Sequence, residues 1–302
     1  MSAAADKPPL ADDKPPLAAG RLALGLLLAP ALLWLGLLIV LPHVNLLLLS
    51  FHDSSGGGDP VWSSTQYATF FGEPLYWNTF VRTATMSLLA TALALVLAFP
   101  VAWTIAKVAR GRTRSWLFAA ILIPFWASEL VRTLGWIILL RQGGILPTLL
   151  HTLGLAGPDL DLLYSDATIL VGLVYGSLLF MLVPLINVLD TLDNSLIEAA
   201  YDLGAGRANI LRRIIIPHAA PGIAAGCLMV FMLTLGNYLT PVVLGGKDSM
   251  WFTDQIYTQF ITRFNWEQGS AFAFLLLLLS SLLVWLGLRL TGQRLASAMR
   301  QT

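Results

Sequence analysis

Six long apolar stretches constrain this chain more than any other feature of its sequence. A helix of about 20 apolar residues is long enough to cross the hydrocarbon core of a bilayer. Inside lipid the backbone must satisfy its own hydrogen bonds, so each stretch is expected to be helical. We therefore predict an all-α membrane protein with six transmembrane helices, at residues 22–41, 80–105, 116–139, 169–188, 222–243 and 271–290.

The composition supports a membrane location. Apolar residues make up 57% of the chain and charged residues only 12%, and the mean hydropathy is +0.74. This balance is far from that of a soluble domain, so much of the surface is expected to face membrane lipid. A formal net charge of +1 argues against nucleic acid as a partner, and the single Cys227 excludes an internal disulfide and a cysteine-based metal cluster.

The first 20 residues differ from the rest. They contain the direct repeat KPPLA at positions 7–11 and 14–18, and proline pairs with mixed charge are typical of a disordered tail. The apolar run after Arg21 is too long for the hydrophobic core of a cleavable signal peptide, which has about 7 to 15 residues. We expect residues 1–20 to be a disordered cytoplasmic tail, and the first span to stay in the protein.

Basic residues predict the orientation of the chain. With both termini cytoplasmic, 13 of the 18 basic residues fall on the cytoplasmic side. They are Lys7, Lys14, Arg21, Lys107, Arg110, Arg112, Arg114, Arg207, Arg212, Arg213, Arg289, Arg294 and Arg300. The five others are Arg82, Arg132, Arg141, Lys247 and Arg263. Cytoplasmic loops carry an excess of Lys and Arg, so this bias favours cytoplasmic termini.

Acidic residues show the opposite bias. Ten of them fall on or toward the outer side: Asp53, Asp59, Glu73, Glu129, Asp159, Asp161, Asp166, Asp248, Asp254 and Glu267. A negative outer face would gather a cationic solute or complement a basic docking surface. The alternative is that these are ordinary solvated loop residues.

A polar segment separates the fourth and fifth apolar stretches. Ser195 and Glu198 have the spacing of a capping box, which predicts a helix beginning there. Gly204 and Gly206 permit the positive φ angles of a tight turn, and a second short helix should follow and end at Pro217. The segment therefore reads as two short helices at the cytoplasmic surface.

This segment resembles the EAA loop of permease subunits in ATP-binding-cassette importers. The matching residues are Glu198, Ala199, Ala200, Gly204, Ile214 and Pro217. One departure is Ile216, where the family usually has leucine. The resemblance implies that residues 191–218 form a cytoplasmic coupling loop, which docks on an ATPase subunit, within a permease domain of residues 21–302. The alternative is a helical hairpin at the membrane surface with no partner.

Two further stretches, residues 123–140 and 236–266, together with Asn78 and Thr79, resemble the spermidine/putrescine branch of these permeases. The resemblance implies a polyamine or related small cation as cargo and a place in the bacterial cytoplasmic (inner) membrane. It also implies three kinds of partner: a second homologous permease subunit, two ATPase subunits and an extracytoplasmic substrate-binding protein. Relatives often carry Asp or Glu where this chain has Asn237, a departure that weakens the inference of cation binding there.

Polar and aromatic residues within the spans are the candidates for a substrate pathway, because polar groups facing lipid are strongly disfavoured. We select Glu129, Tyr175, Asn187, Asn237 and Tyr238. The tyrosine rings could face a cationic amine, and Glu129 could pair with it. Alternatively, the tyrosines are interfacial anchors, Glu129 pairs with Arg132 at helical spacing, and Asn187 bonds a neighbouring helix.

The sequence shows no catalytic constellation. It lacks the phosphate-binding pattern G-x-x-x-x-G-K-[ST], so ATP hydrolysis is expected in a separate subunit. The four histidines have no zinc-type spacing, and we expect no metal or cofactor. Three other readings stay open: a permease for another small solute, a secondary transporter and a non-transporting membrane scaffold.

Overall fold

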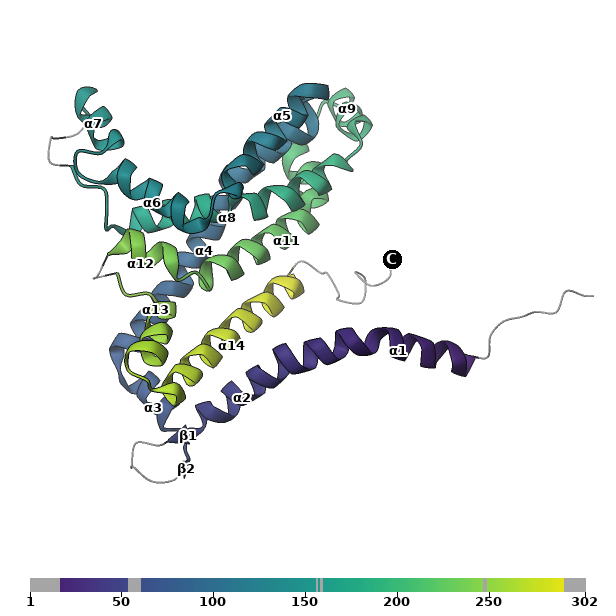
Figure 1. Cartoon of the computed structure of the whole chain (residues 1–302). Coiled ribbons are helices and arrows are strands. Elements are labelled where there is room, and N and C mark those ends of the chain that lie inside the picture. The colour runs from purple at the N-terminus through teal and green to yellow at the C-terminus, as the bar shows by residue number, and fades with distance from the viewer. Residues whose placement is uncertain (1–16, 54–60, 156, 158–159, 247–248, 291–302) are drawn as a thin grey trace, which may run out of the picture. The chain divides into compact units, whose positions relative to one another are not determined.

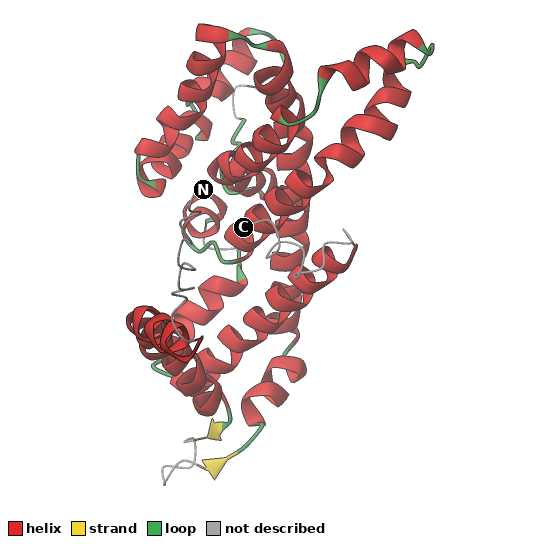
Figure 2. Cartoon of the chain, turned by 90° about the vertical axis from the view of Figure 1, so that its right-hand side faces the viewer, coloured by secondary structure: helices red, strands yellow, loops and turns green. Residues whose placement is uncertain are grey.

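The computed structural model describes residues 17–53, 61–155, 157, 160–246 and 249–290, and these residues are mostly helical (Figure 2). Six helical spans among them are long and apolar enough to cross a membrane. They are Leu26–Ser50, Pro74–Val108, Glu129–Thr152, Asp166–Asp190, Arg207–Leu235 and Trp266–Arg289. The all-α class and the number of spans are confirmed.

The chain divides into two compact units, residues 1–49 and 50–302. In the first, α1 (Leu17–Leu35) leads through a π-helical turn (Gly36–Val40) into α2 (Leu41–Ser50). The side chains of this span are mostly exposed, as expected for a helix that faces lipid or another subunit. Helix α1 begins at Leu17, inside the tail expected for residues 1–20, and the rest of that tail lies outside the described residues.

The second unit begins with a small hairpin, in which β1 (His52–Asp53) pairs antiparallel with β2 (Val61–Trp62). Its helices are α3 (Thr65–Gly72), α4 (Pro74–Trp103), α5 (Gly111–Leu122), α6 (Glu129–Leu140), α7 (Ile145–Thr152), α8 (Asp166–Asp190), α9 (Asn194–Asp202), α10 (Arg207–Ile210), α11 (Ile216–Leu235), α12 (Leu239–Gly245), α13 (Phe252–Tyr257) and α14 (Trp266–Leu290).

The core of the second unit is made by α4, α8 and α11, which pack side by side (Figure 1). Helix α4 presents Ala90, Ala94, Ala98 and Ala102 at intervals of four residues, and all four are fully buried. Small residues on one helix face let neighbouring backbones approach closely, which is the main source of helix association in lipid.

Two glycines allow α11 to pack against α8. A Cβ on Gly222 would lie 2.8 Å from the Pro184 carbonyl oxygen, and one on Gly226 would lie 2.7 Å from the Met181 Sδ. As the sequence advances along α11, its contacts move back along α8, so the two helices run antiparallel.

Polar contacts join α8 at both of its ends to α4 and to the segment that follows α4. Near the first residues of α4 and α8, Arg82 pairs with Asp166 at 2.5 Å. Near the last residues of α8, Arg114 of α5 pairs with Asp190, and Lys107, in the π-helical turn that follows α4 (Thr104–Val108), donates to the Leu192 carbonyl oxygen. The two helices therefore run parallel, as the second and fourth spans must when one span separates them.

The expected third span, residues 116–139, is not one helix. Helix α5 ends at Leu122, a 3₁₀ turn covers Ile123–Trp126, and α6 starts at Glu129. Pro124 accounts for the break, because its ring and missing N–H disrupt an α-helix. The Ser128 hydroxyl then caps α6 by accepting from the Val131 amide at 3.4 Å.

The expected fifth span, residues 222–243, is misplaced. The helix begins at Arg207 and ends at Leu235, and Pro241 lies in the separate helix α12. Pro217 does not end a helix as expected: a π-helical turn (Leu211–Ile215) precedes it, and the helix continues through it to Leu235. Local π-helical adjustment of this kind lets a membrane helix accommodate a proline.

The polar segment also differs in detail from the expected pair of helices. Asp193, not Ser195, caps α9, because its side chain accepts from the Ser195 amide at 2.9 Å. This hydrogen bond lowers the pKa of the exposed Asp193 carboxyl. Gly204 has the expected positive φ of 79°, but Gly206 has φ −69° and needs no glycine for that angle.

We predict that Gly222→Ala destabilises the subunit by about 1 to 3 kcal/mol, the usual cost of overpacking a core. The new methyl group would press on a backbone carbonyl, which cannot rotate away. The measurement is thermal unfolding of the purified protein in detergent.

Gly135→Ala is the matched control, because a Cβ there meets no atom within 4 Å. Alanine has the higher helix propensity, so this variant should be as stable as the parent or slightly more stable. Equal losses in the two variants would contradict close packing at Gly222.

Candidate functional site

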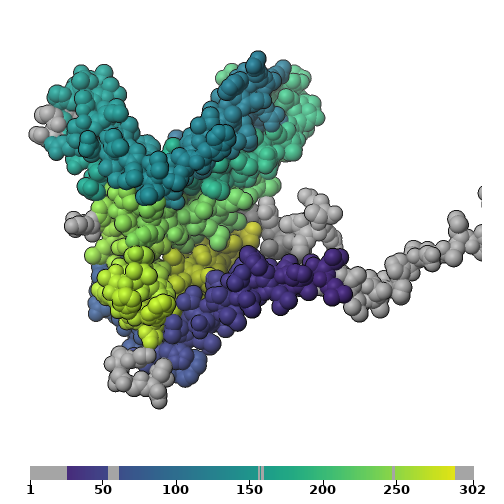
Figure 3. Space-filling model, in the orientation of Figure 1, coloured from purple at the N-terminus to yellow at the C-terminus, as the bar shows by residue number. Residues whose placement is uncertain are grey.

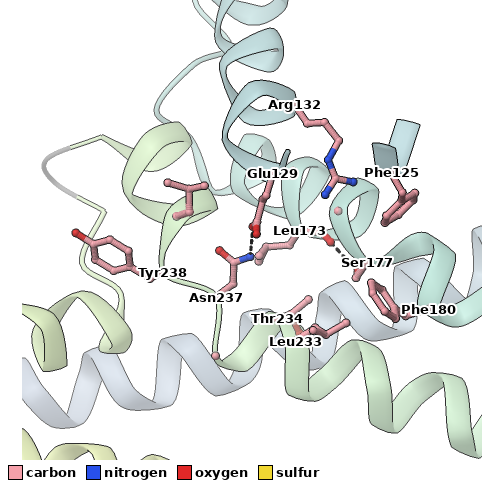
Figure 4. Close-up of a pocket in the computed structure, with 14 residues that line it drawn as sticks. Phe125, Glu129, Arg132, Leu173, Ser177, Phe180, Leu233, Thr234, Asn237 and Tyr238 are labelled. Atoms are coloured by element: carbon pink, nitrogen blue, oxygen red, sulfur yellow. Dashed lines mark hydrogen bonds between the residues drawn. The ribbon is translucent and has the colours of Figure 1, made fainter. Parts of the chain in front are cut away.

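The second unit contains a cavity of about 510 Å³ formed by α6, α8, the end of α11 and the turn that follows it. Its polar lining includes Glu129, Arg132, Ser177, Thr234 and Asn237. Figure 4 shows these side chains, with Phe125 beside Arg132 and Phe180 beside Ser177. A cavity with a few converging polar groups on an apolar wall is the usual form of a small-molecule site.

Glu129 is the first residue of α6, and neutral groups hold its carboxylate. Its Oε1 accepts from the Asn237 Nδ2 at 2.6 Å and from the Thr240 hydroxyl at 3.3 Å. The Asn237 Oδ1 in turn accepts from the Thr240 amide at 2.9 Å. The structure therefore joins two of the expected pathway residues, and it adds Thr240, which the sequence did not indicate.

Arg132 also enters this cavity, although the sequence suggested it only as a partner for Glu129. Its guanidinium lies over the Phe125 ring, 4.6 Å from the centroid (Figure 4). Two of its nitrogens, Nε and Nη1, are buried and have no hydrogen-bond partner in the described part of the chain. Arg132 does not pair with Glu129 here. A basic residue within a predicted span was the signal that could have identified it.

Tyr238 lines the same cavity, but its ring points away from Glu129 (Figure 4). The ring lies against that of Tyr257, with centroids 4.8 Å apart. Burial, followed by the nearby Asp254 charge, raises the pKa of the Tyr238 phenol. Glu129 and Tyr238 therefore face different regions of the protein.

The two other expected pathway residues lie outside the lining of this cavity. Tyr175 packs edge-on against Trp136, with ring centroids 5.5 Å apart. Asn187 is exposed near the end of α8. The cavity thus brings together Glu129, Asn237 and Tyr238, and leaves Tyr175 and Asn187 apart from them.

The residues of the expected coupling loop form a surface with two faces. Ala200 and Ile214 are half-buried and pack against the core of the second unit. Glu198, Ala199, Gly204 and Pro217 are exposed. Leu203, next to the turn at Gly204, is 88% exposed. The loop therefore has an anchored face and a free face that carries an apolar side chain.

Comparison with known proteins gives the following. Residues 98–296 match the family model described as binding-protein-dependent transport system inner membrane component. The spermidine/putrescine transport system permease protein PotB of Salmonella typhimurium is 32% identical over 87% of this chain and 93% of its own. The PotB protein of Haemophilus influenzae is 33% identical over 83% of this chain and 88% of its own.

Solved structures give the same fold. A chain of a bacterial transporter for the import of the acidic polysaccharide alginate aligns with a TM-score of 0.72 and 16% identity, over 92% of this chain and 98% of its own. A chain from an alginate transporter structure that includes a pentasaccharide-bound periplasmic protein aligns with a TM-score of 0.69. At this level of identity the likeness concerns the fold.

We predict that Glu129→Leu lowers stability by about 1 kcal/mol, because the Asn237 amide and the Thr240 hydroxyl lose their shared acceptor. Glu129→Gln keeps an acceptor oxygen and should unfold close to the parent. Thermal unfolding of both variants in detergent is the measurement. If Glu129→Leu unfolds like the parent, the bonds at the turn do not contribute to stability.

Proposed function

Because the chain belongs to the family of binding-protein-dependent transport system inner membrane components, we propose that it is the permease subunit of an ATP-driven importer of polyamines. The relatives named PotB support this cargo, since they match nearly the whole chain. They are permeases rather than enzymes, and the chain is a multi-pass inner-membrane protein like them.

The observation that carries the cargo proposal is the state of Glu129. Within the described residues, both of its hydrogen-bond donors are uncharged, so its negative charge is oriented but not neutralised there. A carboxylate in this state attracts a cation more strongly than one that is already in an ion pair. The ammonium group of a polyamine is a cation of suitable chemistry and size for the cavity.

Arg132 supports a second candidate within the same transport class. Its two unpartnered nitrogens can donate to an anionic group, most naturally a carboxylate. A linear amino acid would place an ammonium group at Glu129 and a carboxylate at Arg132. The cavity chemistry therefore defines two cargo classes, diamines and amino acids of similar length.

We predict that the assembled importer takes up putrescine and that Glu129→Gln slows this uptake by about five-fold, the effect of losing about 1 kcal/mol of charge attraction. Arg132→Gln should leave putrescine uptake unchanged or raise it, because it removes a like charge. Uptake is measured in proteoliposomes with the ATPase and the binding protein held constant.

γ-Aminobutyrate separates the two candidates, because it replaces one amine of putrescine by a carboxylate. If the parent takes up γ-aminobutyrate and Arg132→Gln does not, the result would favour the amino-acid cargo. Glu73→Gln is the control, since it removes an exposed acid outside the cavity. An unchanged putrescine rate in Glu129→Gln would contradict the role of Glu129.

We further propose that α9 is the contact with the ATPase, in an assembly with a second permease subunit, two ATPase subunits and an extracytoplasmic binding protein. The free face of the loop, with Leu203 and Glu198, is available for such a contact. Lys107 and Arg114 lie at the same end of the helices as α9, which supports a cytoplasmic position for this end and for both termini. A single cysteine at position 204 should then be labelled only from the cytoplasmic side.

We predict that Gly204→Asp abolishes transport-coupled ATP hydrolysis while the subunit still inserts. Gly204 has φ 79°, so a side chain there is strained, and it would add a charge beside Leu203 at the proposed contact. The measurement is ATPase activity stimulated by the loaded binding protein, at equal amounts of permease.

Gly111→Asp is the matched control, because Gly111 also has a positive φ, 54°, with no atom near its missing Cβ. It lies at the start of α5, outside the proposed contact. Loss of coupling in both variants would point to general strain and count against α9. Co-purification with an ATPase separates the importer from a secondary transporter or a scaffold.

A further inference from the structure

A second cavity, of about 310 Å³, contains a carboxylate that the cargo proposal does not use. It is lined by Tyr164, Val242, Val243, Gly246, Ser249 and Asp254. Helix α12 lies between the two cavities, because Leu239 at its start lines the first, whereas Val242 and Val243 line the second. Among these described lining residues, Asp254 is the only acid.

Asp254 lies half-buried on α13, and its carboxylate is without a charged partner in the described part of the chain. Among the described residues no hydrogen bond or ion pair reaches its carboxylate. Burial accordingly raises the pKa of Asp254, since no donor compensates for the lost water. A cation that enters the cavity would restore this missing interaction.

Tyr164 lines the same cavity as Asp254, and two further tyrosines, Tyr257 and Tyr238, lie nearby. Tyr257 is three residues further along α13, on the same helix face, and its tilted ring lies against that of Tyr238, with centroids 4.8 Å apart. Asp254 is near enough to Tyr238 for its charge to act on the phenol. Tyrosine rings beside a carboxylate favour an ammonium group, through cation–π attraction to the rings and ion pairing with the acid.

The third ring, Tyr164, is held in a strained conformation. Its φ is 62°, a region that residues other than glycine rarely occupy. Its ring passes so close to Gly246 that a Cβ there would lie 2.6 Å from it. Strain of this kind persists where the surrounding structure fixes a side chain, often at a functional site.

Asn237 connects the two cavities. Its side chain donates to Glu129 at 2.6 Å, and its carbonyl oxygen accepts from the Thr253 hydroxyl at 2.9 Å. Thr253 is next to Asp254 in the chain. Two hydrogen bonds and the peptide bond between Thr253 and Asp254 therefore link the Glu129 carboxylate to Asp254.

We propose that Asp254, together with Tyr164, Tyr238 and Tyr257, forms a second binding site for an alkylammonium group on the route of the same cargo that meets Glu129. The proposal deepens the proposed function and rests on it for the identity of the cargo. It also gives Tyr238 a place in the pathway, with Asp254 as its acidic partner.

The test uses an ammonium reagent as its own probe, so it does not depend on the cargo. Val243→Cys places a thiol in the cavity lining, in an assembled importer whose Cys227 is replaced by alanine. Two labelling rates are measured, one for aminoethyl methanethiosulfonate, which carries an ammonium group, and one for the neutral methyl methanethiosulfonate. The readout is the first rate divided by the second. Asp254→Asn should lower this ratio by about five-fold, the value of one partly solvated charge contact.

Asp254→Glu, which keeps the charge, should preserve most of the ratio, and Glu73→Gln should leave it unchanged. Tyr257→Leu should lower it by a smaller factor. A ratio that stays the same in Asp254→Asn, or falls equally in Glu73→Gln, would overturn the site.

Protection then tests the link to the cargo. Putrescine or spermidine should slow labelling of the cysteine in the parent and not in Asp254→Asn. If the ratio responds to Asp254 but neither polyamine protects, the ammonium site is supported and the polyamine cargo fails. If sodium or potassium chloride protects as well as an equal concentration of polyamine, the site takes any cation and its assignment to an alkylammonium group is overturned.

Discussion

The close approach of α11 to α8 determines where everything else in the second unit can lie. Gly222 and Gly226 allow it, because any side chain at these positions would overlap with the backbone or side chains of α8. Apolar contact with lipid would be as favourable for most of these residues as contact with another helix, so close packing provides the specificity. The resulting core fixes the end of α11 at Leu235, where the chain leaves the helix and builds both cavities. At the other end it anchors α9, which lies at the surface of the second unit, at the upper right of Figure 3.

The sequence predicted the class of fold because the requirement acts locally. A stretch of about 20 apolar residues must form a helix in lipid whatever its neighbours do, so counting such stretches was sufficient. The errors arose where the local geometry of one residue decided the outcome. The helix ends at a 3₁₀ turn that contains Pro124, whereas the helix of the fifth span continues through Pro217 after a π-helical turn. Local π-helical adjustment of the backbone lets a membrane helix accommodate proline, and hydropathy does not report it.

The candidate site was predictable only in part, for a different reason. Glu129 and Asn237 could each be selected as polar residues within apolar stretches. Their hydrogen bond joins residues 108 positions apart, so only the packing of α6 against α12 reveals it. The same holds for Tyr238, whose ring was expected to face the same cation as Glu129. Its ring instead faces Tyr257 and the charge of Asp254, two residues that no motif had linked to it.

The structure also changes the meaning of asparagine at position 237. An acid there had seemed the better ligand for a cation, and its absence a weakness. In Asn237→Asp, a carboxylate oxygen in place of the amide nitrogen would lie 2.6 Å from the Glu129 carboxylate, so two like charges would repel each other where the structure has a hydrogen bond. Asn237 avoids this repulsion, and its amide fixes which oxygen of Glu129 remains free to meet a cation. The departure from the family pattern is therefore compatible with cation transport, and it makes the charge of this cavity depend on Glu129 alone among its acids.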